Sequence, residues 1–458
     1  MSSVYFRKRN NKTTRKLKKQ KIKNEKKKQK IKNEKKQEKT KNKKIKTKNK
    51  NKKKHKHKKT LETTNSRENM RIKISAFSSE SDQETDLDET QELFYTRFPY
   101  LRKDTDFKYL RKFLQERLYK SGGVQLLNSE EAKNQRVYCW ELVKSIGKEI
   151  LDGKELTRIS MPIGLFEPRS FLERLADSFA YAPVYLERAY GSINPIERLK
   201  NVIVFALAGL HLSLTNSKPF NPVLGETYQS SFSNGTKIFC EQTAHHPPSS
   251  NFELIGPKDK YHFFGNGIWS ASFRGNKINC SQEGKCQLNF KDGTIISWNN
   301  PLVHISGVLW GDRVTNFTGK MLFKDQTNDL EAQIIFDPAS LGFVKSIFFS
   351  QKLPTHSISG TIYKSSPKKK KNRKIFSKIE GSWIESISFD GDPYWDIDEN
   401  LPERPIPEKN PLPSDSTLRK DRNALLKNDL QSAGEMKIMI EEKQRYNYRL
   451  RETRSFRK

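Results

Sequence analysis

Three charged residues near the end of the chain have a spacing that could bind an anion. Lys437, Glu441 and Arg445 are four residues apart, so in a helix each is turned by only about 40° from the last and all three share one face. A lysine supplies a mobile point charge and an arginine a bidentate contact, and both suit a phosphate. The same spacing also fits two exposed ion pairs of about 0.3–0.5 kcal/mol each, and local physics alone favours that interpretation.

A histidine pair in the middle of the chain offers further anion ligands. His245 and His246 follow residues 237–240, which have strand character, and precede two prolines that cannot donate hydrogen bonds to a sheet. Neighbouring strand residues point to opposite faces, which disfavours a shared metal ion, but beside a bend both rings could converge on a phosphate. Turn histidines packed against the prolines are the alternative.

The sequence around these groups resembles the oxysterol-binding protein family. The family's signature, Glu-Gln-x-x-His-His-Pro-Pro, reads here from Glu241 to Pro248. Further blocks occur in the family's order, and the match spans roughly residues 135 to 453. These blocks are Ile159–Pro162 with Glu167–Leu172, Lys218–Glu226, Asp415–Arg422 and Glu441–Arg445.

The resemblance implies a fold that is mainly β with flanking helices (α+β). This fold is a large, nearly complete antiparallel β-barrel around a lipid tunnel, with an N-terminal lid at about residues 137–158 and a C-terminal helical region. The resemblance also implies a phosphoinositide head-group site in which basic residues hold the phosphates and a glutamate orients two of them or accepts an inositol hydroxyl. Carried onto this sequence, the site is Lys218, His245, His246, Lys437, Glu441 and Arg445.

The function implied by the resemblance is lipid binding and transfer between membranes without catalysis. Phosphatidylinositol 4-phosphate would be exchanged for a second lipid, a sterol or phosphatidylserine, because both compete for one tunnel. A lipid sensor or scaffold that binds the same lipids without bulk transfer is the alternative. A hydrolase using the histidine pair and Glu241 is disfavoured because no nucleophile arrangement or metal set accompanies them. We expect no cofactor.

The charge of the chain is concentrated at its beginning. The sequence has 87 Lys and Arg against 53 Asp and Glu, a net charge of +34. Residues 1–60 hold 30 Lys and Arg against three Glu, which leaves a net +7 for the other 398 residues. Such a segment lacks apolar residues to offset the entropy of ordering, so we expect a disordered tail. It could bind anionic membrane surfaces, act as a nuclear import signal or a non-specific RNA-binding arm, or be an extension with no specific partner. We expect no specific nucleic acid.

Residues 61–134 are expected to be a linker with an acidic run and a short helix. The acidic run, from Ser78 to Glu92, precedes Phe94 and faintly resembles the two-phenylalanine motif by which some family members attach to a receptor of the endoplasmic reticulum. A solvated linker that balances the basic tail is the competing interpretation. The lipid-binding domain itself is expected over residues 135–453.

Cysteine usage and apolar runs point to a reduced, cytoplasmic protein, and the family resemblance implies transient association with membrane surfaces. The four cysteines have no paired metal-binding spacing, and the start of the chain lacks a signal-peptide pattern. The longest apolar run, Val202 to Leu210, is too short for the roughly 20 residues that a spanning helix needs.

The sequence pattern predicts helices first, then strands, and a closing helix near the end. Helices are expected over Thr105–Tyr119, Val137–Ile146, Phe171–Tyr190, Pro195–Leu214 and Leu430 to about Arg451. From Tyr228 onward, turn residues recur at the spacing of an antiparallel meander, with a last strand at Gly381-Ser382-Trp383. Lys368 to Lys374 are expected to form a basic loop that touches membrane or solvent.

Overall fold

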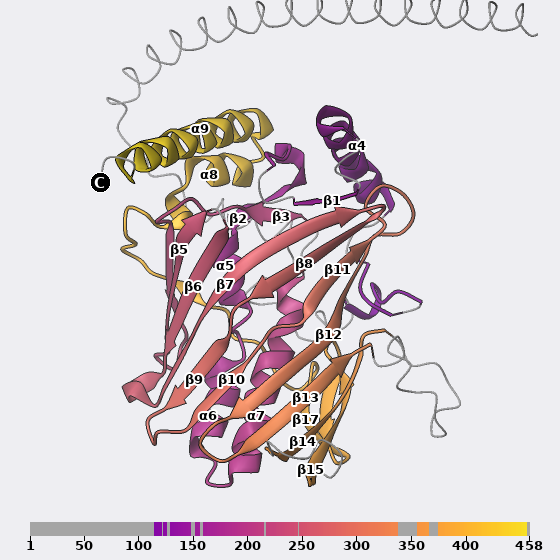
Figure 1. The fold of residues 1–458 in the computed structure, drawn as a ribbon, viewed down its shortest axis with the longest axis vertical. Helices are drawn as coiled ribbons and strands as arrows, with labels where there is room; N and C mark the ends of the chain where they lie inside the picture. Colours follow the sequence, from indigo (N-terminus) through magenta and orange to yellow (C-terminus); the bar gives the residue numbers. More distant parts are fainter. Residues whose placement is uncertain are drawn as a thin grey trace, which may run out of the picture. The chain divides into compact units, whose positions relative to one another are not determined.

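An antiparallel sheet of 16 strands dominates the computed structural model (Figure 1). The strands follow the order β17-β16-β15-β14-β13-β12-β10-β9-β7-β6-β5-β4-β18, with β1, β8 and β11 paired beside this path. Their bounds are β1 Asp152–Glu155, β4 Thr227–Ser231, β5 Lys237–His245, β6 Pro248–Ile255, β7 Tyr261–Arg274, β8 Lys277–Glu283, β9 Cys286–Phe290, β10 Ile295–Trp298, β11 Leu302–Ser306, β12 Val314–Asp325, β13 Leu330–Phe336, β14 Ser357–Lys364, β15 Ile375–Ser382, β16 Ser386–Phe389, β17 Asp392–Asp396 and β18 Ile406–Pro407. A separate parallel pair joins β2 (Phe166–Ser170) to β3 (Lys218–Phe220).

The structure describes residues 114–120, 122–125, 129–147, 152–155, 159–214, 217–245, 247–337, 355–365 and 374–455. All of them belong to the unit Asp86–Lys458. The predicted basic tail, the acidic run with Phe94, and residues 368–373 of the predicted basic loop lie outside the described residues. Most of the predicted helix over 105–119 also lies outside the described residues. In its described part, Leu114 and Gln115 are helical, whereas Leu118 pairs with Val124 in a β-bridge.

Short turns join successive strands from β4 to β12 where the sequence has turn residues. Gly235, Gly275, Gly284, Gly293 and Gly311 all have positive φ, the backbone conformation that these turns require. Burial alternates along β5, with Ile238, Cys240 and Gln242 buried and their neighbours exposed. The predicted antiparallel meander is therefore confirmed.

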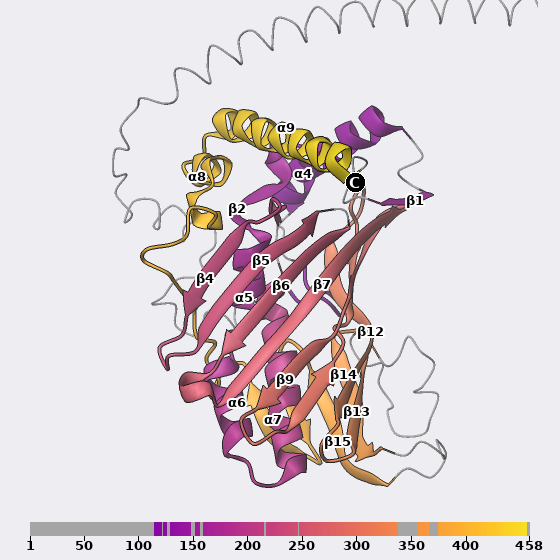
Figure 2. The same ribbon diagram turned by 60° about the vertical axis from the view of Figure 1, so that its left-hand side comes forward.

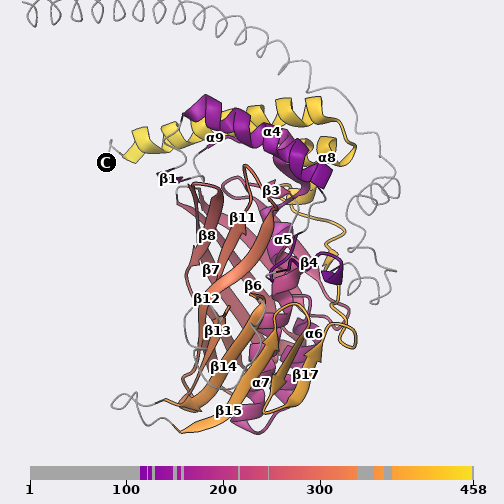
Figure 3. The same cartoon turned by 90° about the vertical axis from the view of Figure 1, so that its right-hand side faces the viewer.

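Helices α5, α6 and α7 lie inside the curve of the sheet, and α4, α8 and α9 lie at one end of the strands (Figures 1 and 3). Helix α5 contacts β4 and β5 near one end of the strand order, and α7 contacts β17 at the other end, so the sheet must bend around them. No hydrogen bonds pair β17 with β18 in the described part of the chain, so the curved sheet stays open, in keeping with the expected nearly complete barrel. The helices are α4 Ser129–Ile146, α5 Phe171–Asp177, α6 Ala182–Gly191, α7 Pro195–Ala208, α8 Lys420–Leu426 and α9 Leu430–Ser455.

Local chemistry sets the helix ends. Asn194 caps α7, because its Oδ1 accepts a hydrogen bond from Ile196 N at 2.9 Å, and Pro195 occupies the first turn as predicted. The expected single helix over Phe171–Tyr190 is wrong: Pro183 lacks the N–H that a continuous helix needs and instead lies in the first turn of α6. Helix α7 also ends early, at Ala208, and continues as a 3-10 turn from Gly209 to Ser213.

The predicted last strand is also wrong. Gly381 and Ser382 end β15, and three further strands, β16, β17 and β18, follow it. These strands have two to five residues each, too few to show a two-residue period in the sequence. Among the described residues, no helix has the length and apolar character to cross a membrane.

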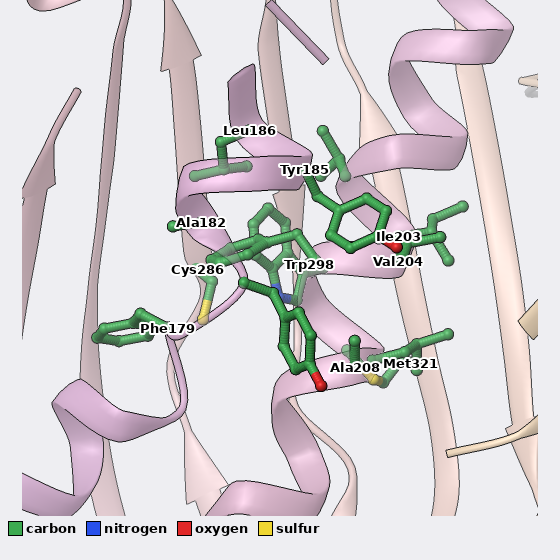
Figure 4. Packing of buried hydrophobic residues seen from close by; sticks show 14 of the residues in the cluster. Phe179, Ala182, Tyr185, Leu186, Ile203, Val204, Ala208, Cys286, Trp298 and Met321 are labelled. Atoms are coloured by element: carbon green, nitrogen blue, oxygen red, sulfur yellow. The ribbon is translucent and has the colours of Figure 1, made fainter. Parts of the chain in front are cut away.

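The inner helices lie against the sheet (Figure 2), and aromatic side chains fill the space between them (Figure 4). Trp298 of β10 stacks on Phe263 of β7, with ring centroids 5.0 Å apart, and on Phe323 of β12, 5.5 Å away. Phe205 of α7 meets the same indole edge to face. Such ring pairs add to the free energy gained from burial, so this cluster ties the helices to the middle of the sheet.

Truncating the centre of this cluster should destabilise the protein strongly. We expect Trp298→Ala to lower the free energy of unfolding by about 3–5 kcal/mol, because the cavity it leaves adds to the lost burial. The matched control is Leu302→Ala, whose side chain is 49% exposed and which should change stability by less than about 0.5 kcal/mol. Denaturant unfolding measures both, and equal effects would contradict the assignment of Trp298 to the core.

Candidate functional site

A cavity of about 580 Å³ lies at the end of the sheet that α9 covers. Its walls come from α9, from the end of β5 and from the segments around β2 and β3. Four of the six predicted site residues line it, namely His245, Lys437, Glu441 and Arg445. His246 lies outside the described residues.

The three residues of α9 form the ion pairs that their spacing allows. Lys437 Nζ lies 2.5 Å from Glu441 Oε1, and Arg445 Nη2 lies 3.1 Å from Glu441 Oε2. Their surroundings differ sharply, since Lys437 is 6% exposed and the Arg445 side chain is 60% exposed. These residues therefore pair with each other and also line a cavity, and phosphate binding by them stays a prediction.

Lys218 stands beside the cavity, although it does not line it. Its Nζ donates to Pro219 O at 3.1 Å and to Asn221 Oδ1, and Asn221 is a cavity residue. The ammonium groups of Lys218 and Lys437 lie 5.0 Å and 5.2 Å from the centre of the Phe166 ring. Burial, followed by repulsion from Lys437, lowers the pKa of Lys218 to about 8. An anion bound here would relieve that repulsion.

A β-bulge turns His245 toward the cavity. Gln242 pairs with Ser250 and Ala244 pairs with Ser249, so Thr243 is an extra residue in β5. Up to Gln242 the even-numbered residues point inward, and after the bulge His245 takes the inward position opposite Pro248. An unbroken strand would have turned His245 outward.

The Gln242 amide holds this bulge. Its Nε2 donates to Ala244 O at 2.6 Å, and its Oε1 accepts from Ser250 Oγ at 2.6 Å. Its backbone also binds the loop after β3, through Gly225 N to Gln242 O and Gln242 N to Glu226 O, both 2.9 Å. The Lys218–Glu226 block and the histidine block are therefore fixed to each other.

Glu226 connects these two blocks to the C-terminal part of the chain. Its carboxylate accepts from Val223 N at 2.9 Å, from Arg419 Nη1 at 2.7 Å and from Ser170 Oγ. Arg419 lines the cavity and binds Asp421 as well, at 2.8 Å. Burial raises the pKa of Glu226, and the guanidinium of Arg419 opposes that rise.

Buried ion pairs hold the remaining sequence blocks together. Arg422 makes a bidentate contact with Glu173, at 2.8 Å for each oxygen, and so joins α8 to α5. Arg174 binds Glu167 in the same manner, at 2.6 Å for each oxygen. These groups are nearly inaccessible to water, where removing one partner leaves a buried unpaired charge.

Helix α4 covers apolar residues next to the cavity. Val143 of α4 packs against Phe273 and Leu309, and Ile159 and Met161 adjoin the same cluster. The predicted helix over 137–146 is confirmed, although it begins earlier, at Ser129. Residues 148–151 and 156–158 of the expected lid lie outside the described residues.

The strand face below α4 is apolar but only partly buried. Trp269 and Ala271 of β7 share the face of Phe273, which looks toward α4, and Ile278 and Ile305 lie beside them on β8 and β11. All four are of intermediate exposure, and Trp269 meets Phe171 of α5 edge to face at 4.9 Å. Inward-facing apolar groups that keep solvent contact mark space that an apolar ligand could fill.

Sequence reasoning missed Ser160, Asn221 and Arg419 as cavity residues. Each lies inside a block that carries the family resemblance, which was the available signal. Asn221 and Arg419 each have one charged partner nearby, Lys218 and Asp421, but that spacing does not indicate that they line a cavity. Contacts that join segments far apart in the chain bring them there. Ser160 shows this well: its Oγ lies 2.7 Å from Glu441 Oε2 and 3.1 Å from Lys437 Nζ.

Removing the amide that holds the bulge should weaken the site. Gln242→Met keeps the shape but leaves Ala244 O and Ser250 Oγ without their partner, so we expect stability to fall by about 1–3 kcal/mol. Affinity for a soluble inositol phosphate, measured by calorimetry, should fall at least about tenfold once His245 loses its position. Gln229→Met, on the partly exposed neighbouring strand, is the control and should change neither quantity. Unaltered inositol phosphate binding by Gln242→Met would show that the bulge is unimportant.

The lowered pKa of Lys218 predicts a pH dependence. As pH rises through about 8, free Lys218 loses its proton, so affinity for an inositol phosphate should fall about three- to tenfold between about pH 7 and about pH 9. The phosphate itself has completed its second ionisation by then and adds no trend. Lys218→Arg keeps its charge and should give a flatter profile. Calorimetric titrations over this range measure both proteins, and identical slopes would exclude Lys218.

Comparisons with known proteins agree with this architecture. The family model described as "Oxysterol-binding protein" matches residues 140–409. Oxysterol-binding protein 9 of Dictyostelium discoideum is 44% identical over 344 residues, which cover 73% of this chain and 80% of that protein.

Two solved structures have a similar fold. The ORD domain of Osh1 in complex with ergosterol has a TM-score of 0.57 and 23% identity, covering 77% of this chain and 90% of that one. The ORD of Osh3 from Saccharomyces cerevisiae in complex with PI(4)P has a TM-score of 0.54 and 24% identity, covering 68% and 84%. The matched family model and the Dictyostelium relative together show that the chain belongs to the oxysterol-binding protein family.

Proposed function

We propose that this protein binds phosphatidylinositol 4-phosphate and a second lipid, a sterol or phosphatidylserine, and exchanges them between membranes without catalysis. The observation that carries the proposal is the convergence of His245, Lys437 and Arg445 on one cavity that adjoins a partly buried apolar face. Two similar folds support the choice of lipids, because Osh3 was solved with PI(4)P and Osh1 with ergosterol.

The lipid phosphate would replace Glu441 as the ion-pair partner of Lys437 and Arg445. Glu441 bridges Lys437 and Arg445, and a phosphate with more negative charge and more acceptor oxygens competes well for both. Lys218 and His245 would complete the phosphate contacts, and Glu441 would then be available to an inositol hydroxyl. The acyl chains would lie along the apolar face of β7, β8 and β11 beneath α4, which acts as the lid.

Exchange follows from competition for that apolar space. If the acyl chains and the second lipid cannot be bound together, each displaces the other, and a gradient of the phosphoinositide drives the second lipid against its own gradient. We further propose that the protein works in the cytoplasm, with residues 1–60 attracted to anionic membrane surfaces. Each basic residue near such a surface contributes about 1 kcal/mol.

The test is lipid extraction from liposomes that contain phosphatidylinositol 4-phosphate, alone or with sterol or phosphatidylserine, followed by mass spectrometry of the bound lipid. Displacement of the phosphoinositide by one second lipid would support exchange and identify that lipid. Tight binding with negligible transfer would instead indicate a sensor. A folded protein that extracts no phosphoinositide would refute the proposal.

Removing cations from the cavity should separate the two ligands. Lys437→Ala, and the double variant His245→Ala with His246→Ala, should each lower phosphoinositide extraction at least tenfold, because one charged hydrogen bond contributes about 1.5–3 kcal/mol. Uptake of a sterol should stay close to wild type, since a sterol has no phosphate for these cations to bind. Lys443→Ala is the matched control, as Lys443 is an exposed cation of the same helix that does not line the cavity. Equal loss of both lipids would contradict this division of roles.

A further inference from the structure

Ser160 has contacts that an ordinary surface serine lacks. The residue is exposed, and residues 159–162 form neither helix nor strand. Its Oγ donates to Glu441 Oε2 at 2.7 Å and accepts from Lys437 Nζ at 3.1 Å. The hydroxyl of Ser160 therefore lies inside the cavity, directly beside the ion pair at its centre.

The cavity around this hydroxyl is strongly positive. Lys437, Arg445, Arg449 and Arg451 all line it, together with Arg419, and Glu441 is the acidic group among its lining residues. Arg419 is already bound by Glu226 and Asp421, whereas Lys437 and Arg445 share the single carboxylate of Glu441. The set that faces Ser160 therefore has more positive than negative charge.

We propose that Ser160 is a phosphorylation site whose phosphate occupies the position that the lipid phosphate would otherwise take. An ATP-dependent protein kinase would transfer the γ-phosphoryl group of ATP to Ser160 Oγ, with loss of the hydroxyl proton and release of ADP. The consequence for lipid binding rests on the proposed function, but the position of the phosphate does not.

Electrostatics favours this arrangement. Phosphoserine carries a charge of about −1.5 to −2 and three acceptor oxygens. It would repel Glu441 and form ion pairs with Lys437 and Arg445 in its place. A lipid phosphate must replace Glu441 in the same way. Because the group is tethered, its effective concentration in the cavity reaches the millimolar range or above, so free lipid would compete poorly. Phosphorylated protein would thus be unable to bind the phosphoinositide while its apolar site stayed open.

Access to the hydroxyl is compatible with modification. A kinase would have to break the two side-chain hydrogen bonds of Ser160, but no ladder of sheet hydrogen bonds holds residues 159–162. In the sequence, Arg158 stands two residues before Ser160 and Pro162 two residues after it. The exposed position and the absence of regular structure both favour a transient opening.

The position of the phosphate can be tested without any lipid. Phosphoserine is introduced during translation at position 160 of the full chain and, in a control protein, at position 233. Ser233 is exposed and lies in the turn at the end of β5 opposite His245. By phosphorus NMR, the second pKa of the phosphate, ordinarily about 6, should fall by about one unit or more at 160 but not at 233. Lys437→Ala with Arg445→Ala should restore the ordinary value. Equal pKa values at the two positions would overturn the proposal.

The functional consequence is tested by extraction from liposomes containing phosphatidylinositol 4-phosphate. Phosphoserine at 160 should lower extraction at least tenfold relative to the control, with sterol uptake unchanged. If the unmodified protein extracts no phosphoinositide, the proposed function is wrong. If the Ser160-phosphorylated protein extracts phosphoinositide normally, only the proposed inhibition by phosphorylation is wrong. Peptide mapping of the protein from its own cells should find phosphate on Ser160. A Ser160 peptide that is always unmodified, while phosphate is detected elsewhere in the chain, would overturn its use as a site.

Discussion

Repulsion between basic side chains gathered in a poorly solvated cavity is the constraint on which this structure depends. Lys218 and Lys437 both lie close to the Phe166 ring, and burial together with their mutual repulsion lowers the pKa of Lys218. Such a cluster persists without ligand only if acidic groups hold it in place. Glu441 does this for Lys437 and Arg445, and Glu226 with Asp421 does it for Arg419.

The two kinds of counter-ion differ in how firmly they are held. Glu226 is 2% exposed and is fixed by backbone and side-chain donors from three segments, so Arg419 belongs to the scaffold. Glu441 lies on an outer helix, with its side chain 25% exposed. Its bonds exchange more easily because water can replace them. In the proposed function, the phosphate of the ligand would therefore meet a rigid frame that carries two cations whose present partner, Glu441, can be exchanged.

Much of this arrangement could be predicted from the sequence, because its signals are local. The four-residue spacing in α9 gave the ion pairs, and the turn residues after Tyr228 gave the hairpins. The bulge at Thr243 could not be predicted, since whether His245 faces inward depends on the register with β6. Arg419 and Ser160 were missed for a related reason: Glu226, which binds Arg419, and Glu441, which binds Ser160, lie about 200 and 280 residues away in the chain. Pro183, by contrast, was a local signal that should have divided the helix predicted over Phe171–Tyr190.

The charged residues that line the cavity and the apolar residues beneath α4 lie in different parts of the structure. This separation affects which lipids the protein could select. The charged cavity residues His245, Lys437, Glu441 and Arg445 come from two sequence blocks, which the bulge in β5 and helix α9 bring together. In the proposed function, a change among them would act on the phosphate of the ligand. The apolar face comes from single residues on β7, β8 and β11, which sheet pairing makes neighbours. A substitution such as one at Ala271 changes the shape of that face and leaves the contacts of the charged residues intact. The preference for the proposed second lipid would therefore change independently of head-group binding, because packing and charge act at different places in the same site.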